Sequence, residues 1–189
     1  MMHDHRFMSD PSRVLCSLSH IVSLSSPYRG SGELVEVMAT SDNVVRAGLT
    51  PKLRDVDVLC DMLTYRTGAP EVLHPSPGGL TYYRPPFDEF QIAVACTDSP
   101  GQEVRVPGNG GGALVLVQKG GGEMRVVGLG PEEAAVAKEG GMEGVEEWVK
   151  VMRGDVLYVA AGGGIEIRGG DGEEGVVAYV AAVNDRVFG

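Results

Sequence analysis

The sequence predicts a mainly β protein in which short strands form a sandwich or a barrel. Glycine accounts for 28 of the 189 residues, and most of it lies after Pro100 in runs that break helices and form turns. Between these turns, apolar segments recur at the length of strands. Many short strands separated by turns are typical of sandwich and barrel folds.

Between residues 30 and 65, the chain contains one expected strand and one expected helix. A short apolar strand is predicted at residues 34–38, followed by a polar turn. Asp55 is predicted to cap a helix, because the apolar residues after it follow helical spacing at Val56, Leu59, Cys60 and Leu63.

Eight further strands are expected toward the C-terminus. They are predicted at residues 80–83, 90–95, 103–106, 113–118, 124–127, 156–160, 165–167 and 176–183. The uninterrupted apolar run at 113–118 predicts a strand that is buried on both faces. Residues 131–150 have helical composition interrupted by two glycines, so we expect a helical or disordered insertion there, with Trp148 on a surface helix.

Composition and charge narrow the class of protein. The net charge of −10 argues against non-specific nucleic-acid binding, which needs basic side chains to displace counterions from phosphates. No apolar run approaches the ~20 residues of a membrane span. Three widely spaced cysteines without a CxxC pair fit a reducing compartment. We therefore expect a cytoplasmic protein without a membrane or nucleic-acid partner.

The most distinctive segment runs from Gly32 to Lys52, because its polar residues stand among apolar ones. Arg46 follows two valines and precedes Ala47-Gly48, and a guanidinium in such surroundings is suited to binding carboxylates or phosphates. Glu36 lies ten residues earlier on the expected strand. Taken alone, these residues favour an ordinary buried ion pair between Glu36 and Arg46.

A family resemblance changes this interpretation. The twelve residues Ser41–Lys52, SDNVVRAGLTPK, and the following Asp55–Leu63, DVDVLCDML, closely resemble the signature of type I phosphomannose isomerases. Weaker resemblance continues in Tyr83-Arg84-Pro85-Pro86 and in Arg153–Leu157. The chain is thus identified as similar to the C-terminal part of such an enzyme, and the resemblance implies a cupin-like jelly-roll barrel with a short helix after the signature.

The resemblance also implies a domain division, a chemistry and a set of site residues. Residues 1–29 have no counterpart in the family, and residues 30–189 would form its C-terminal cupin-like domain. The family interconverts mannose 6-phosphate and fructose 6-phosphate, a reaction that feeds GDP-mannose synthesis. Its enzymes use a zinc ion bound in a cupin barrel. Arg46 matches the catalytic arginine, while Lys52 and Glu36 match residues of the substrate-binding pocket. Lys52 would contact the anionic substrate, and Glu36 would do acid–base work or orient Arg46.

The metal site is where the sequence departs from the family. Three of the four metal ligands have no counterpart in this chain, and Pro27 occupies the position of the fourth, a histidine. A proline cannot bind a metal. His3 and His5 form an HxH pair, but in a polar terminus that more often stays disordered. We therefore predict no metal site and no zinc bound by this chain.

Two hypotheses of different class follow. In the first, the chain is a shortened mannose-6-phosphate isomerase, inactive by itself. In the second, it is a non-catalytic cupin remnant that acts as a binding or interaction module. The abrupt loss of resemblance at Pro27, against close matching from Gly32, favours the first. The sequence leaves the oligomeric state open.

Overall fold

The structure is a computed structural model of the 189-residue chain. It describes residues 35, 37, 45, 46, 48, 50–63, 65, 79–130, 146–172 and 175–189. They fall into two units, one with the helix and one with the strands, and each is described by itself. The predicted segment 1–29 and most of the predicted insertion, at 131–145, lie outside the described residues, so both stay predictions.

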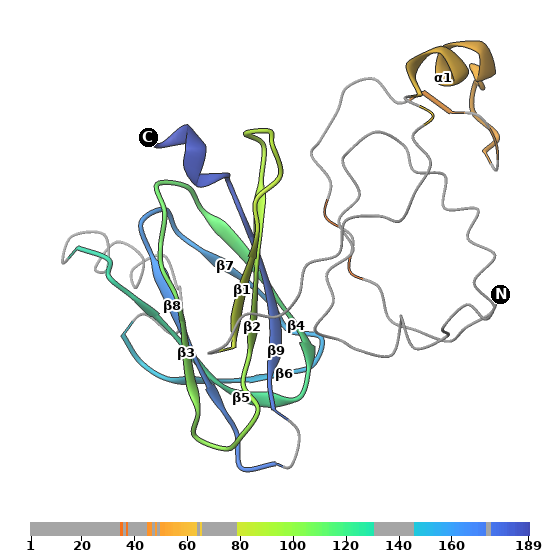
Figure 1. The fold of residues 1–189 in the computed structure, drawn as a ribbon. Helices are drawn as coiled ribbons and strands as arrows, with labels where there is room; N and C mark the ends of the chain where they lie inside the picture. Colours follow the sequence, from red (N-terminus) through yellow and green to blue (C-terminus); the bar gives the residue numbers. More distant parts are fainter. Residues whose placement is uncertain are drawn as a thin grey trace, which may run out of the picture. The chain divides into compact units, whose positions relative to one another are not determined.

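The strand unit contains nine strands among its described residues (Figure 1). They are β1 (Leu80–Tyr83), β2 (Gln91–Cys96), β3 (Glu103–Val106), β4 (Ala113–Lys119), β5 (Gly121–Val127), β6 (Val149–Met152), β7 (Val156–Val159), β8 (Gly164–Gly169) and β9 (Val177–Ala182). A short 3₁₀ turn, η2 (Asp185–Val187), follows the last strand. All eight strands predicted for this half are present, and β6 is the one that the sequence missed.

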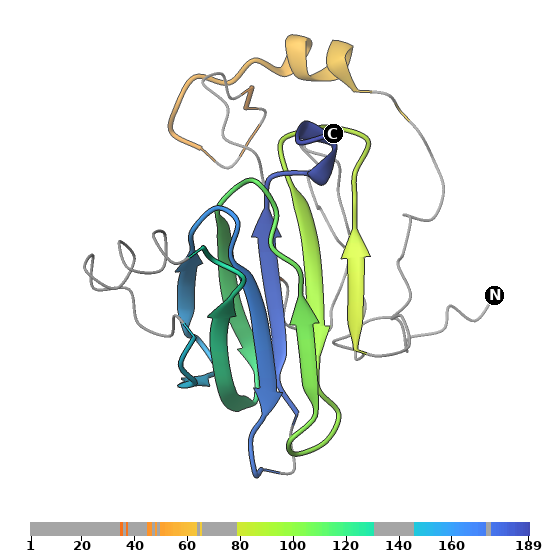
Figure 2. The same cartoon turned by 90° about the vertical axis from the view of Figure 1, so that its left-hand side faces the viewer.

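Strand pairing defines the fold as a jelly roll. Strand β2 pairs with β9, β3 with β8, β4 with β7 and β5 with β6, each antiparallel. Strands β2–β5 thus pair with β6–β9 in reverse order, like one long hairpin folded over on itself, and β1 adds to β2 at the edge. Additional pairing of β4 with β9 and of β5 with β8 joins the strands into two sheets, β1-β2-β9-β4-β7 and β3-β8-β5-β6. This is the predicted mainly β jelly roll, and Figure 2 shows it from the side.

The core lies between the two sheets and is built from alternate residues of each strand. Met124, Ile165 and Ile167 come from the four-stranded sheet, and Val115 and Val117 face them from β4. All five are at most 2% exposed. β-Branched side chains predominate because they pack well on a pleated surface.

Two glycines show why this chain is rich in that residue. Gly120 alone connects β4 to β5, which lie in different sheets, and it does so with φ of 72°. A side chain would strain this left-handed backbone. At Gly175, just before β9, a Cβ atom would overlap the carbonyl oxygen of Thr97, so only glycine allows the two backbones to approach.

The outer faces of the two sheets differ in character. The predicted burial of residues 113–118 on both faces is wrong, because Leu114 on the outer side of β4 is 55% exposed. Only one face of this sheet packs against the second sheet, so the strand alternates despite its continuous apolar sequence. The outer face of the four-stranded sheet, in contrast, carries charges.

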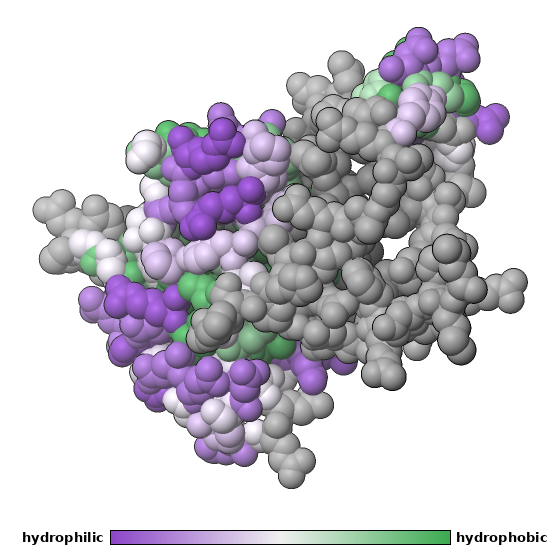
Figure 3. Space-filling view, in the orientation of Figure 1, coloured by the Kyte–Doolittle hydropathy of each residue, from purple (hydrophilic) through white to green (hydrophobic). Residues whose placement is uncertain are grey.

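The charged face is an alternating ladder across the strands. Arg168 lies between Glu103 and Glu123, at 2.7 and 3.4 Å, and the register places these residues side by side on β8, β3 and β5. In the next rung Glu166 contacts Arg125 at 2.6 Å. Opposite charges on neighbouring strands stabilise the pairing, and Figure 3 shows hydrophilic residues gathered over β3 and β8.

Trp148 belongs to this ladder and not to the predicted surface helix. The guanidinium carbons of Arg168 and Arg125 lie 4.0 and 4.5 Å from the centre of its ring, within the range of cation–π attraction. Residues 146–148 are not helical, and β6 begins at Val149. The predicted insertion therefore ends before residue 149, because residues from Val149 onward pair with β5 as strand β6.

Asn184 fastens the end of β9 to the turn between β1 and β2. The side chain is fully buried, and its amide group donates hydrogen bonds to the carbonyl oxygens of Pro85, at 3.2 Å, and Phe87, at 2.8 Å. Its Oδ1 accepts a bond from the backbone N–H of Arg186. One side chain thereby satisfies backbone groups from two segments that lie about a hundred residues apart in the chain.

We predict that Asn184→Ala lowers the free energy of unfolding by about 2–3 kcal/mol, because buried carbonyl groups lose their donors. Urea unfolding followed by circular dichroism measures this. Asn184→Asp, which keeps the shape but removes the donating NH₂ group, should be at least as destabilising. An unchanged urea midpoint in both variants would contradict the role of the amide.

Candidate functional site

The signature segment contains the first group of candidate residues. Arg46 is half-buried, and its backbone carbonyl accepts a hydrogen bond of 2.7 Å from the backbone N–H of Asp55. Lys52 lies between them and is exposed, and its backbone N–H donates to Oγ1 of Thr50 at 3.2 Å. The loop that carries both predicted cations is therefore closed by a hydrogen bond between its two ends.

The helix α1 (Val56–Met62) begins where this loop closes. As predicted, Asp55 is its N-cap, and the carboxylate accepts a hydrogen bond of 3.1 Å from the N–H of Val58. A seven-residue helix is marginal without such support. Leu59 is its buried residue, whereas Val56 is 49% exposed. Among the described residues, no helix is long and apolar enough to cross a membrane.

The predicted site is described only in part. Arg46 and Lys52 are placed on the same short loop, but Glu36 and Pro27 lie outside the described residues. The proximity of Glu36 to Arg46 and the absence of a ligand at Pro27 therefore stay predictions. Val35 and Val37, the described residues of the strand predicted at 34–38, are not in a strand.

The interior of the jelly roll offers little room for a ligand. Its cavity measures about 20 Å³ and lies at one end of the barrel, lined by Tyr82, Gln91 and Asn109 together with apolar side chains. That volume holds about one water molecule. A sugar phosphate cannot enter it without displacing core residues.

The described residues also do not fit a metal ion. Within them, no three His, Cys, Asp or Glu side chains lie together in a group able to hold one. The interior positions are occupied by alanine, valine, isoleucine and methionine, which are not ligands for zinc. All four histidines of the chain lie outside the described residues.

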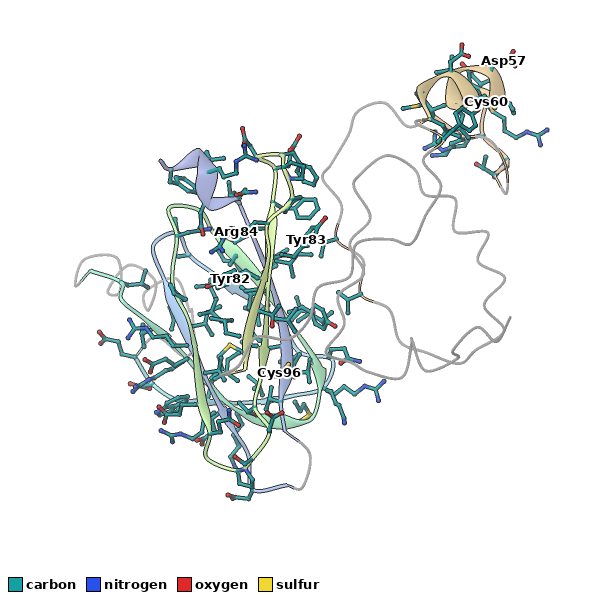
Figure 4. All side chains as sticks on the ribbon, in the orientation of Figure 1. Asp57, Cys60, Tyr82, Tyr83, Arg84 and Cys96 are labelled. Atoms are coloured by element: carbon teal, nitrogen blue, oxygen red, sulfur yellow. The ribbon has the colours of Figure 1, made fainter. Side chains whose placement is uncertain are left out.

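Five polar residues lie at the same end of the barrel as the cavity, and we call them the mouth cluster. It consists of Tyr82, Arg84, Gln91, Asn109 and Asp185. Arg84 donates to Oε1 of Gln91 at 3.2 Å and to Oδ2 of Asp185 at 3.3 Å, while its guanidinium carbon lies 4.1 Å from the ring centre of Tyr82. Figure 4 shows Tyr82 and Arg84 on the same side of the chain, with Tyr83 on the other.

Electrostatics tie the mouth cluster together. Burial alone would raise the pKa of Asp185, but hydrogen bonds from Gln91, Asn109 and Arg84, with the guanidinium charge, lower it below its ordinary value of 3.8. Burial raises the pKa of Tyr82, although the charge of Arg84 opposes this. The cluster is therefore a hydrogen-bonded network around the half-exposed ion pair of Arg84 and Asp185, and it links β1 and β2 to the C-terminal turn.

The sequence contained a signal for part of this cluster. Tyr83-Arg84-Pro85-Pro86 stood out as a family resemblance, but nothing in the sequence paired Arg84 with Asp185, 101 residues away. Such a contact depends on the folded-over strand order, which brings the ends of β1 and β9 to one end of the barrel.

The chain is 42% identical over 160 residues to mannose-6-phosphate isomerase 2 of Arabidopsis thaliana, a match that covers 84% of this chain and 32% of the relative. It is 38% identical over 164 residues to the probable mannose-6-phosphate isomerase of Dictyostelium discoideum, covering 84% and 33%. The chain thus spans about a third of the length of these relatives. No family model matches the sequence.

Solved structures with a similar arrangement are cupins of low sequence identity. A cupin protein from Bacteroides fragilis is 11% identical, with a TM-score of 0.42 and coverage of 65% of this chain and 86% of that one. The Cnp3 cupin domain of Schizosaccharomyces pombe is 15% identical, with a TM-score of 0.40 and coverage of 58% and 66%.

The strand order makes this chain a jelly-roll protein of the cupin type. Within that class, its sequence makes it a relative of the mannose-6-phosphate isomerases. It matches one part of them, consistent with the C-terminal part that the signature predicted.

We predict that Asp185→Asn lowers stability at pH 7, and that the difference from the wild type shrinks as the pH falls below about 3.8. The folded carboxyl has a lowered pKa, so its contribution is present above the unfolded pKa and is lost on protonation in the folded state. Urea unfolding at pH 7 and pH 3 measures this. Asp171→Asn, at an exposed carboxylate, is the control. An equal loss at both pH values would contradict the ion pair.

Proposed function

We propose that this chain supplies one part of a mannose-6-phosphate isomerase, an enzyme that interconverts mannose 6-phosphate and fructose 6-phosphate and feeds GDP-mannose synthesis. The observation that supports this is the identity of 42% over 160 residues to a relative of that name. The match extends over 84% of the chain, which favours the isomerase over an unrelated binding module.

The chemistry assigns roles to the signature segment. Moving a proton between two neighbouring sugar carbons requires a base and a group that stabilises the negative oxygen of the enediolate. Arg46 is suited to the second task, because its guanidinium stays charged and its backbone is held by the bond to Asp55. Lys52, exposed on the same loop, is suited to contact the anionic substrate, with Glu36 as a further substrate contact.

By itself, the chain is proposed to be inactive. The jelly-roll cavity is too small for the sugar phosphate, and the described residues hold no group of metal ligands. The relatives are about three times as long as the matching part, so an active site would need residues from elsewhere. Zinc and a cytoplasmic location are likewise proposed for the enzyme as a whole.

We expect the purified chain to show no isomerisation of mannose 6-phosphate, even with added zinc, in an assay coupled to fructose 6-phosphate. Elemental analysis after gel filtration should find zinc well below one equivalent per chain. Turnover above background that disappears in Arg46→Ala would contradict the proposed inactivity, as would tight binding of one zinc ion.

The isomerase role is tested by complementation. The full chain is coexpressed with the part of the Arabidopsis relative that lies outside the match, and turnover is expected to appear. Arg46→Ala should then lower kcat/KM roughly 100- to 1000-fold, the usual effect of removing one group that stabilises an oxyanion.

Arg54→Ala is the matched control, since Arg54 is an exposed arginine on the same loop and no role is assigned to it. Equal losses in Arg46→Ala and Arg54→Ala would contradict the role of Arg46. Absence of turnover from a complex that does form would count against the proposed function as a whole.

A further inference from the structure

The outer face of the five-stranded sheet is apolar where a solvent-facing surface is expected to be polar. We call its far end the β4–β7 face, made of Leu114, Leu116, Val156, Tyr158 and Tyr179. Leu114 is 55%, Tyr158 59% and Val156 66% exposed. The register places Leu114 beside Tyr158, and Leu116 between Val156 and Tyr179.

These five residues, of which Leu116 and Tyr179 are partly buried, form one continuous patch. They occupy two adjacent rungs on three neighbouring strands, β7, β4 and β9. No charged residue interrupts those rungs, whereas on β3, β8 and β5 of the other sheet every outward position of two adjacent rungs is charged. Contiguous exposed apolar surface of this kind marks sites of protein–protein contact.

Strand β7 adds a second feature. Among the described strands it has β4 as its neighbour on one side and stands at the edge of its sheet on the other. Edge strands are usually protected by charged residues or proline, but β7 consists of Val-Leu-Tyr-Val. An edge strand without charged residues or proline, next to an exposed apolar face, is typical of a surface that a partner covers.

The length of the relatives indicates what covers it. The matching part is only 32% and 33% of the two isomerases compared above, so about two thirds of such a polypeptide lies beyond it. Permanent interfaces are more apolar than transient ones, and tyrosine is enriched among residues that carry binding energy. A face with two tyrosines and no charge has the chemistry of a permanent interface.

We propose that the β4–β7 face is the docking surface for the remaining part of a mannose-6-phosphate isomerase polypeptide. This rests on the proposed function, because that function supplies the partner. The docking proposal adds a defined surface to the proposed function. Through this surface, whose residues are not those of the signature loop, the jelly roll would join the rest of the enzyme.

The test coexpresses the tagged 189-residue chain with the part of the Arabidopsis isomerase outside the match. The chain is expected to raise the soluble yield of that part and to copurify with it in a one-to-one complex, measured by gel filtration with light scattering. The double variant Leu114→Glu and Tyr158→Glu should weaken association at least about tenfold, because it places charges at the centre of the interface.

The control is Arg105→Gln with Lys150→Gln, which changes the net charge by the same amount on the charged outer face. It should leave association unchanged. Thermal unfolding by circular dichroism checks that both double variants fold, as expected for side chains that are largely exposed.

Three results would overturn the proposal. One is no rise in soluble yield and no copurification with the wild-type chain. Another is equal weakening in the Gln control. The third is a wild-type chain that forms dimers by itself, lost in the Leu114→Glu and Tyr158→Glu variant, which would assign the face to a second copy. A complex that forms through this face without turnover would contradict the proposed function only.

Discussion

The antiparallel pairing of β2–β5 with β9–β6 in reverse order is the constraint on which the strand unit depends. It forces two sheets face to face and requires every second residue of each strand to be apolar. Met124, Ile165 and Ile167 meet Val115 and Val117 in the resulting interior. Close packing of these side chains leaves a cavity of about 20 Å³ at the barrel end, so among the described residues the space between the sheets is filled by side chains.

Because the interior is filled, the features of this unit that could bind a partner lie on its surfaces. At one end of the barrel, Arg84 and Asp185 form a half-exposed ion pair, next to Asn184, whose buried amide binds the β1–β2 turn. The two outer sheet faces then diverge, since one is a ladder of alternating charges around Trp148 and the other is apolar. A charged ladder tolerates water, whereas exposed leucine and tyrosine favour a partner.

The signature loop is organised differently from the barrel. Its cations depend on local contacts, namely the bond between the backbones of Arg46 and Asp55 and the cap that Asp55 provides to α1. Both contacts lie within the segment from Arg46 to Val58, so they organise the loop and the start of α1 locally.

A sequence signature indicated the similarity to mannose-6-phosphate isomerases. Local patterns predicted the mainly β class, the Asp55 cap and eight of the nine described strands, because alternation, turn residues and caps act between near neighbours. The same patterns failed at Ala113–Lys119 and at Trp148. An apolar run cannot show which face will meet the second sheet, and a segment of helical composition became part of β6 because arginines from β5 and β8 lie against its tryptophan. Only the tertiary structure decided that Arg84 meets Asp185, that the cavity among the described core residues is smaller than a sugar phosphate, and that one outer face is apolar. Each of these depends on strands far apart in the chain becoming neighbours, which no local pattern encodes.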